Sequence, residues 1–337
     1  MRQAMSDNPS QQSGDIPQNC ASCGSALITR WAPVIDPQTR ERFTVLECPA
    51  CGLGHTSPRP ADLDPYYGAQ YYQDGKRHGF SEQFRFRQRL RHVLREKQPP
   101  ARLLDLGCGS GGFLQIAAAA GFEVRGTDRG EAAMIAAARG LSISDHIGAI
   151  PDNREFDVIT AWHSLEHFAD PADELRQARA VMAPQGCLVL AVPDAGGWQA
   201  RFHGRFGFAL DVPRHLYHFD EGSLRQLLHA SGFAVDTVRH QEIEFDIFGW
   251  MQSSLNAVLP TPNLLFGKLT GAAVAGRTGE TILSFLLGSL LFPFALLATL
   301  ASTAAGRGGT LVVVARPKEA DDPAPTSSGY QPDHHTG

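Results

Sequence analysis

Four cysteines near the start of the chain are spaced as metal ligands. They form two C-x-x-C pairs, Cys20-Ala-Ser-Cys23 and Cys48-Pro-Ala-Cys51, and a glycine follows each pair directly. Two thiolates three residues apart on a tight knuckle bind one tetrahedral ion, and the glycines let the backbone turn toward the sulfurs. The pattern therefore predicts a structural zinc site with these four cysteines as ligands. The alternative, two disulfides, conflicts with the lack of a recognisable secretory signal.

A glycine-rich turn follows the first strongly apolar strand pattern. Residues 102–114 read RLLDLGCGSGGFL, and glycines in such a turn let the backbone approach a ligand closely. No Lys-Ser/Thr pair follows, which excludes a P-loop, although the spacing also satisfies the weak dinucleotide fingerprint. Asp105, two residues before the first glycine, can hold a ligand ammonium group but would repel a pyrophosphate. Asp128, at the end of the next apolar strand, can accept both hydroxyls of a ribose.

These motifs resemble the class I S-adenosylmethionine-dependent methyltransferases. LLDLGCGSG resembles their first motif, FDVITAWHSLEHFADP their fourth-strand segment, and VMAPQGCLVLAVP the following helix end and fifth strand. The resemblance covers residues 64–246 and 308–317. It implies that S-adenosylmethionine is the cofactor. The residues that it places at the cofactor are Asp105, Gly107, Gly109 and Gly111 at the methionine part, Asp128 at the ribose, Asp145 at the adenine, and His163 beside the cofactor.

The triplet Leu165-Glu166-His167 is a candidate for catalysis. Some relatives, the ubiquinone-pathway O-methyltransferases, have a glutamate three residues before the glutamate of this triplet, where this chain has His163. That difference weighs against a metal role for the triplet. Two interpretations remain open: Glu166 and His167 take part in catalysis, or they position the loop.

A third histidine follows the fifth strand. Residues 213–219, PRHLYHF, resemble a P-x-H-x-x-x-F segment found in methyltransferases that act on sugars and other small substrates. The resemblance places His215 at the carboxyl end of the sheet, where ligands bind in this fold. His215 is therefore a candidate general base for a substrate hydroxyl, and the alternative is that it only fixes the loop.

The elements that must position these residues alternate between strand and helix patterns. From residue 102, short apolar runs are separated by Ala- and Leu-bearing helical segments, which predicts a mostly parallel, doubly wound α/β sheet. With the resemblance, the prediction is a seven-stranded Rossmann-like methyltransferase sheet. A small zinc ribbon precedes it and a helical apolar insertion interrupts it before the last strand. The expected divisions are 1–17 disordered, 18–60 zinc module, 61–242 methyltransferase domain, 243–307 insertion, 308–317 last strand, and 318–337 disordered.

The insertion contains an uncharged stretch between Glu280 and Arg307. Residues 282–300 are apolar over a length near the thickness of a bilayer, but Pro293 lies near the centre. We expect two short helices that meet at Pro293 as a hairpin on a membrane surface, with peripheral contact through 281–306. The alternative is a buried helical pair that forms a dimer interface or a lid. Three arginines of the predicted helix 80–97 could face anionic lipid, although a solvated face is the ordinary interpretation.

Composition limits the classes of function. The 337 residues are 43% hydrophobic and 19% charged, with a net charge of −5, as in a soluble globular protein. Six cysteines are too sparse for a secreted disulfide framework, so we expect a cytoplasmic location, with possible attachment to the membrane face. The acidic net charge argues against a nucleic-acid partner.

The combined features predict an S-adenosylmethionine-dependent methyltransferase that modifies a small molecule, a sugar or a lipid-linked glycan at oxygen or carbon. One alternative is an RNA methyltransferase that uses the zinc ribbon as an RNA clamp. The other is a binding protein that keeps the fold without turnover, which the intact glycine turn and Asp105 disfavour. The sequence leaves the acceptor and the oligomeric state open.

Overall fold

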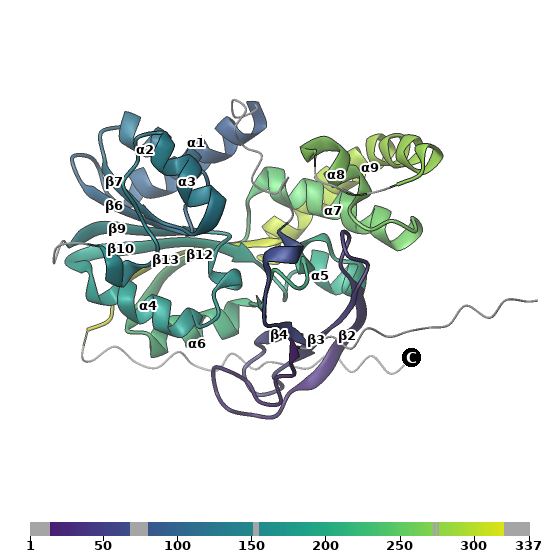
Figure 1. The fold of residues 1–337 in the computed structure, drawn as a ribbon, viewed down its shortest axis with the longest axis horizontal. Helices are drawn as coiled ribbons and strands as arrows, with labels where there is room; N and C mark the ends of the chain where they lie inside the picture. Colours follow the sequence, from purple (N-terminus) through teal and green to yellow (C-terminus); the bar gives the residue numbers. More distant parts are fainter. Residues whose placement is uncertain (1–13, 68–79, 151–154, 272–273, 275, 320–337) are drawn as a thin grey trace, which may run out of the picture.

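The computed structural model describes residues 14–67, 80–150, 155–271, 274 and 276–319 (Figure 1). Its centre is a seven-stranded sheet with the strand order β12-β13-β10-β9-β6-β7-β8. Strands β6 to β10 pair in parallel, whereas β13 runs antiparallel to both of its neighbours. The strands are β6 (Arg102–Leu106), β7 (Glu123–Thr127), β8 (Ile143–Ser144), β9 (Phe156–Trp162), β10 (Met182–Pro193), β12 (Phe233–Arg239) and β13 (Thr310–Pro317). The predicted doubly wound methyltransferase sheet is confirmed.

Helices cover both faces of this sheet (Figure 1). On one face lie α1 (Phe80–Glu96), α2 (Gly112–Ala119) and α3 (Gly130–Ala138). On the other lie α4 (Pro171–Ala180) and α6 (Glu221–Ala230). Because parallel strands are buried on both faces, their sequences are continuous apolar runs such as CLVLAV in β10, and these runs separate two hydrophobic cores.

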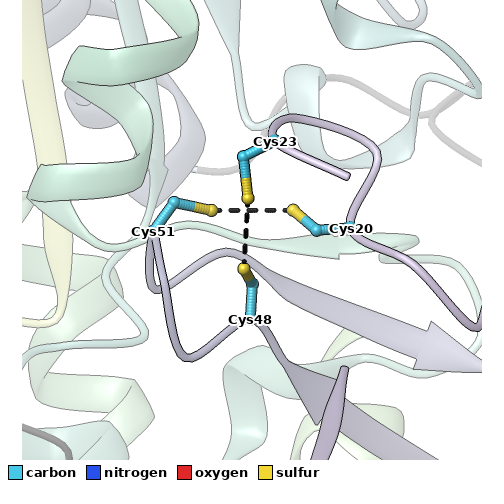
Figure 2. Close-up of side chains that lie close together, drawn as sticks. All are labelled: Cys20, Cys23, Cys48 and Cys51. Carbon is cyan, nitrogen blue, oxygen red and sulfur yellow. Dashed lines mark hydrogen bonds between the residues drawn. The ribbon is translucent and has the colours of Figure 1, made fainter. Parts of the chain in front are cut away.

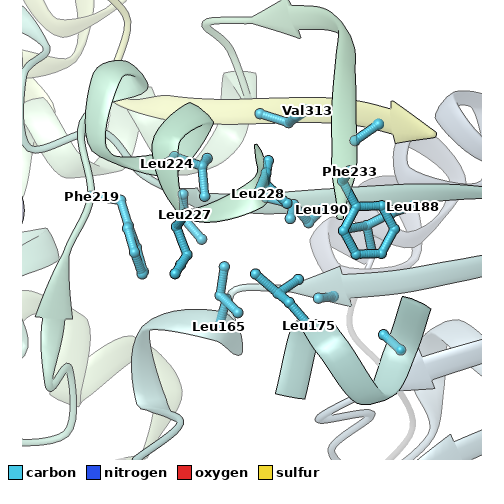
Figure 3. Close-up of a cluster of buried hydrophobic side chains, with 14 of the residues drawn as sticks. Leu165, Leu175, Leu188, Leu190, Phe219, Leu224, Leu227, Leu228, Phe233 and Val313 are labelled. Carbon is cyan, nitrogen blue, oxygen red and sulfur yellow. The ribbon is translucent and has the colours of Figure 1, made fainter. Parts of the chain in front are cut away.

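Figure 3 shows the core beneath α4 and α6. Leu188 and Leu190 of β10 contribute to it from the sheet, and Leu175 of α4 and Leu227 of α6 close it from the helices. Leu165, which directly precedes the candidate pair Glu166 and His167, belongs to the same core and is fully buried. The catalytic candidates therefore follow a rigidly packed residue.

The N-terminal module is a small antiparallel sheet of order β11-β4-β3-β2. Its own strands are β2 (Ile28–Ile35), β3 (Arg42–Glu47) and β4 (Gly54–Ser57), but β11 (Tyr217–His218) comes from the methyltransferase segment. The two-residue strands β1 (Gly14–Asp15) and β5 (Arg59–Pro60) pair separately. Residues 14–15 are thus ordered, contrary to the expected disorder, while 1–13 and 320–337 lie outside the described residues.

The described residues of the insertion form three helices beside the sheet: α7 (Ile243–Val258), α8 (Leu264–Thr270) and α9 (Thr278–Ala304). The predicted hairpin at Pro293 is wrong, because α9 is one continuous helix of 27 residues that contains this proline. Proline removes only one backbone hydrogen bond. Contacts between α9 and the helices α7 and α8 hold the segment, with Gly288 and Ala295 buried before and after the proline, so the helix continues.

Candidate active site and four-cysteine metal site

The glycine turn joins β6 to α2, and only its middle glycine, Gly109, faces open space. Gly107, Gly109 and Gly111 have φ angles of 67°, 56° and 81°, a region that glycine adopts at low cost. A Cβ on Gly107 would lie 2.5 Å from the Cβ of Ser164, so this position requires glycine also for space. A Cβ on Gly109 would meet no atom within 4 Å. The backbone at Gly109 therefore borders room for a ligand.

Two carboxylates flank this turn. Asp105, in β6, is 3% exposed and accepts a hydrogen bond of 2.6 Å from the hydroxyl of Thr160. Burial raises the pKa of Asp105 to about 7. Asp128, directly after β7, accepts backbone hydrogen bonds from Gly109 at 2.6 Å and Arg129 at 2.7 Å. Burial also raises the pKa of Asp128.

This donor set fits S-adenosylmethionine. The buried carboxylate of Asp105 suits an ammonium group, and the half-buried carboxylate of Asp128 retains lone pairs for ribose hydroxyls. The exposed Asp145 lies one residue beyond Ser144, whose carbonyl accepts the N–H of Asp128. The predicted cofactor residues at β6, β7 and β8 thus lie along one edge of the sheet, and their roles stay predictions.

His163 is held in a buried chain of charges. It has a φ of 52° directly after β9, and its Nε2 lies 2.5 Å from a carboxylate oxygen of Glu242. The guanidinium of Arg89 donates to the other oxygen of Glu242 at 2.9 Å, and Phe245 stacks on the imidazole. Burial by itself would lower the pKa of His163, but the carboxylates of Glu242 and Glu166 outweigh it and raise this pKa to about 9.

Glu166, His167 and His215 converge in one cluster. Each can offer one ligand or base atom, and these three atoms lie within 4.8 Å of one another. Glu166 is fully buried, and among the described residues neither of its carboxylate oxygens has a hydrogen-bond partner. Burial opposes its ionisation, but the imidazole of His163, 3.7 Å away, and the neighbouring histidine charges lower the pKa of Glu166. The structure therefore places an ionised carboxylate beside two imidazoles.

Backbone carbonyls orient both imidazoles. The Nδ1 of His215 lies 2.9 Å from the carbonyl oxygen of Ala209, and the Nδ1 of His167 lies 3.0 Å from that of Arg214. A carbonyl only accepts, so each Nδ1 carries a proton, and the neutral form of each ring has its lone pair on Nε2. The Nε2 of His215 lies 3.8 Å from Glu166. Burial and the neighbouring His215 lower the pKa of His167 to about 4.

A small cavity adjoins this cluster. Its lining includes Glu166, His215, Asp194, Gln199 and Tyr217, and its volume is about 30 Å³. This volume holds about one water molecule. In this conformation the cavity is therefore too small for a sugar ring.

The four cysteines also converge, as Figure 2 shows. The Sγ atoms of Cys20 and Cys51 are 3.6 Å apart, and those of Cys23 and Cys48 are 3.4 Å apart. Their glycines, Gly24 and Gly52, have positive φ and donate backbone hydrogen bonds to the carbonyls of Cys20 and Cys48. All four cysteines are free thiols, and a tetrahedral zinc–thiolate site needs sulfurs roughly 3.8 Å apart. The set therefore fits Zn²⁺ and does not form the alternative disulfides.

The N-terminal module contacts the loop of His215 directly. Thr56 in β4 donates its hydroxyl to the carbonyl of His215 at 2.6 Å, and its N–H bonds to the carbonyl of Leu216. Arg214, which is 2% exposed, pairs with Asp36 at 3.2 Å. Sequence reasoning missed these contacts and those of Glu242 with His163 and Arg89. The only local feature of the sequence that could have indicated a role for Glu242 is its position as a carboxylate soon after a predicted strand.

The arginines of α1 differ in their exposure to solvent. Arg87, Arg91 and Arg95 are exposed, as the ordinary interpretation of a solvated face expects. Arg89 is instead buried against Glu242 and lies 5.3 Å from the ring centroid of Trp162. Arg89 thus supports the site, while Arg87, Arg91 and Arg95 face solvent.

The strand order and the glycine turn after β6 together define the fold of class I methyltransferases. Residues 77–238 match the family model described as a methyltransferase domain, and the chain contains an S-adenosylmethionine-dependent methyltransferase domain of this family.

Curated relatives match part of this domain. A ubiquinone biosynthesis O-methyltransferase of Caulobacter sp. (strain K31) is 36% identical over 104 residues, covering 27% of this chain and 40% of the relative. That of Aeromonas salmonicida (strain A449) is 33% identical over 102 residues, covering 27% and 42%. The chain thus spans less than half the length of these relatives. Among solved structures, a SAM-dependent methyltransferase from Archaeoglobus fulgidus is 17% identical, covers 70% of this chain and 94% of its own, and has a TM-score of 0.44.

Proposed function

We propose that this protein transfers the methyl group of S-adenosylmethionine to a hydroxyl oxygen of a small-molecule or lipid-linked acceptor, with His215 as general base. The observation that carries the proposal is the orientation of His215. Its Nδ1 donates to Ala209, which leaves the Nε2 lone pair beside the carboxylate of Glu166. The similarity to ubiquinone biosynthesis O-methyltransferases, which covers 27% of this chain, supports oxygen as the acceptor atom.

The cofactor supplies a methyl group on a positively charged sulfur, which leaves as a neutral thioether. Asp105 would bind the ammonium group at one end of the cofactor, and Asp128 would accept the ribose hydroxyls. These contacts orient the reacting methyl, so that catalysis rests mostly on positioning. His163, held by Glu242, would border the same cleft at the carboxyl end of β9.

The remaining chemistry is removal of one proton. As the acceptor oxygen forms its bond to the methyl carbon, its proton passes to Nε2 of His215. The imidazolium that forms lies 3.8 Å from the carboxylate of Glu166, which stabilises the new positive charge. Because the adjoining cavity holds about one water, the acceptor must reach His215 from the cofactor side or by movement of the surrounding loops.

His215 is tested with methyl-labelled cofactor and fractionated cell extracts as acceptors. We expect wild-type protein to label a small-molecule or lipid fraction. His215→Gln should lower turnover by about 100-fold or more while the affinity for S-adenosylhomocysteine stays within about twofold. Equal turnover by this variant would show that His215 only shapes the loop. Label in purified RNA instead would favour the RNA methyltransferase alternative.

A divalent-cation site is the second interpretation of Glu166, His167 and His215. It rests on their mutual separations below 4.8 Å and on the unpartnered carboxylate of Glu166. The two interpretations differ in metal dependence. A base requires no added metal, so activity should survive chelation when the zinc content, measured in parallel, is unchanged. Activity that is lost on chelation and restored by Mg²⁺ would favour the cation site.

A further inference from the structure

The long helix α9 presents its apolar side chains outward. Eight leucine and phenylalanine side chains of this helix are 42–65% exposed, among them Leu286, Leu290 and Leu297 at 64–65%. The buried positions of α9 are instead small or hydroxylated, namely Ser284, Gly288, Ala295, Thr299 and Ser302. A helix on the surface of a water-soluble domain shows the opposite arrangement. Small inward residues with large apolar residues outward are typical of helices that contact lipid.

Three serine hydroxyls of α9 form hydrogen bonds within the helix. Residues 281–306 contain no charged side chain. The hydroxyl of Ser289, which is exposed, donates to the carbonyl of Phe285 at 2.9 Å, and the hydroxyls of Ser284 and Ser302 likewise donate to carbonyls of the helix. A protein partner ordinarily adds about one hydrogen bond per 100–200 Å² of interface. The central face of α9 has no charged side chain and few polar side chains that could form such hydrogen bonds, whereas the core of a bilayer requires no hydrogen bonds.

An apolar groove lies on the same side of the molecule. It runs between α7, α8 and α9, with Met251, Leu265, Leu269, Phe285 and Phe292 in its lining, and has a volume of about 390 Å³. This volume lies in the range of pockets that hold small ligands. Leu269 is 59% exposed, so the groove continues the outward apolar face of α9.

Positive charge borders this apolar face. The exposed residues Lys268, Arg277 and Arg307 lie in α8, directly before α9 and soon after α9, respectively. The one acid in the first turn of α9, Glu280, accepts hydrogen bonds from the N–H and hydroxyl of Thr261. A rim of exposed cations around an apolar face complements the phosphate groups at a bilayer surface.

We propose that the outer face of α9 and its adjoining groove dock on a phospholipid bilayer, with the helix in the plane of the membrane. α9 is long and apolar enough to cross a membrane, since its most apolar part has a mean hydropathy of 2.2. However, β12 before the insertion and β13 after it are neighbours in one sheet, with Arg239 opposite Val312. Both ends of the insertion therefore belong on one side of the membrane, and α9 remains attached to α7 along one face.

Vesicle flotation tests this proposal without reference to activity. Wild-type protein should float with phosphatidylcholine vesicles, also at high salt, and more strongly when anionic phosphatidylglycerol is added. The triple variant Leu286→Glu, Leu290→Glu and Leu297→Glu should bind about tenfold more weakly or not at all. The matched control is Met134→Glu on α3, where an equally exposed apolar side chain lies outside the proposed surface.

Two further measurements separate the outcomes. Thermal unfolding of the triple variant should match wild type, because the changed side chains are exposed. Light scattering in the absence of lipid reports the oligomeric state. Wild-type protein that ignores vesicles, or a folded triple variant that still floats, overturns the proposal. A wild-type dimer that ignores vesicles and that the triple variant dissociates would assign the face to a second copy of this chain.

Discussion

The guanidinium of Arg214 forms a buried ion pair with Asp36, a residue 178 positions earlier in the chain. Arg214 directly precedes the candidate base His215, and Asp36 follows β2 of the four-cysteine module. Arg214 also donates to the carbonyl of Tyr66 and pairs with Asp211. Together with the bond from Thr56 to His215, this contact makes the N-terminal module part of the support for the active-site loop.

Loss of Asp36 should therefore destabilise the protein. Asp36→Asn leaves the charge of Arg214 with one carboxylate fewer in a buried setting, which typically costs about 3–5 kcal/mol of unfolding free energy. Denaturant unfolding measures this change. The matched control is Asp236→Asn, which breaks the exposed pair with Arg316 and should cost less than about 1 kcal/mol. Equal effects of the two substitutions would contradict the structural role of the buried pair.

The cysteine cluster should hold about one zinc ion per chain. Cys48→Ser removes one thiolate, so metal analysis should show zinc loss, and the loop of His215 should lose its support. We expect turnover to fall by about tenfold or more while affinity for S-adenosylhomocysteine changes little. Cys187→Ala, at a buried thiol of β10 outside the cluster, serves as the control. Carefully reduced wild-type protein that contains no zinc would reject the site.

Asp128 should contribute to cofactor affinity. Asp128→Ala removes the proposed acceptor of two ribose hydroxyls and also the acceptor for the N–H of Gly109. We expect S-adenosylhomocysteine to bind about tenfold or more weakly by calorimetry, because hydrogen bonds to a charged group contribute about 1.5–3 kcal/mol each. Asp157→Ala, at the amino end of β9 and thus at the opposite end of the strands from the glycine turn, should leave affinity unchanged. Preferential binding of a nicotinamide dinucleotide would contradict the cofactor assignment.

Cofactor binding should depend on pH through Asp105. Burial raises the pKa of this carboxyl to about 7 in the free protein, so below this pH the group is protonated and must lose its proton to pair with an ammonium ion. Affinity should therefore rise with pH up to about 7, by up to roughly tenfold per pH unit, and then level off. Calorimetry between pH 5.5 and 8 measures this profile. Asp105→Asn should bind weakly with little pH dependence, and a flat wild-type profile would refute the role of Asp105.

The raised pKa of Asp105 also affects stability. A carboxyl with a folded-state pKa above its unfolded value binds protons more tightly when folded, so unfolding free energy falls as pH rises from about 4 to 7. At pH 7 the burial of the ionised Asp105 carboxylate is expected to lower the unfolding free energy, and a cationic ligand bound beside it should offset this loss. Asp105→Asn should therefore flatten this part of the stability profile of the free protein, which thermal unfolding at several pH values can measure.

The amino-acid sequence by itself determined the features that depend on short stretches of chain. Each of these features depends on residues that are close together in the sequence. They are strand 102–106 with its glycine turn, the two C-x-x-C pairs, and the alternation of strands and helices. Backbone preferences of glycine and apolar periodicity act over that range, and the structure confirms the sheet and brings the four cysteines together. The candidate cofactor residues at the glycine turn, Asp105, Gly107, Gly109 and Gly111, could be predicted from the sequence for the same reason.

Only the tertiary structure decided which distant residues meet. Glu242 beside His163, Asp36 beside Arg214, and Glu166 beside His215 are separated by 79, 178 and 49 positions, and no local pattern encodes such pairs. The strand that completes the N-terminal sheet likewise comes from residues 217–218. Pro293 shows that a local pattern can also predict a feature that the tertiary structure does not contain. Its local preference predicts a helix break, but contacts with α7 and α8 outweigh one missing hydrogen bond, so the fold overrides the residue.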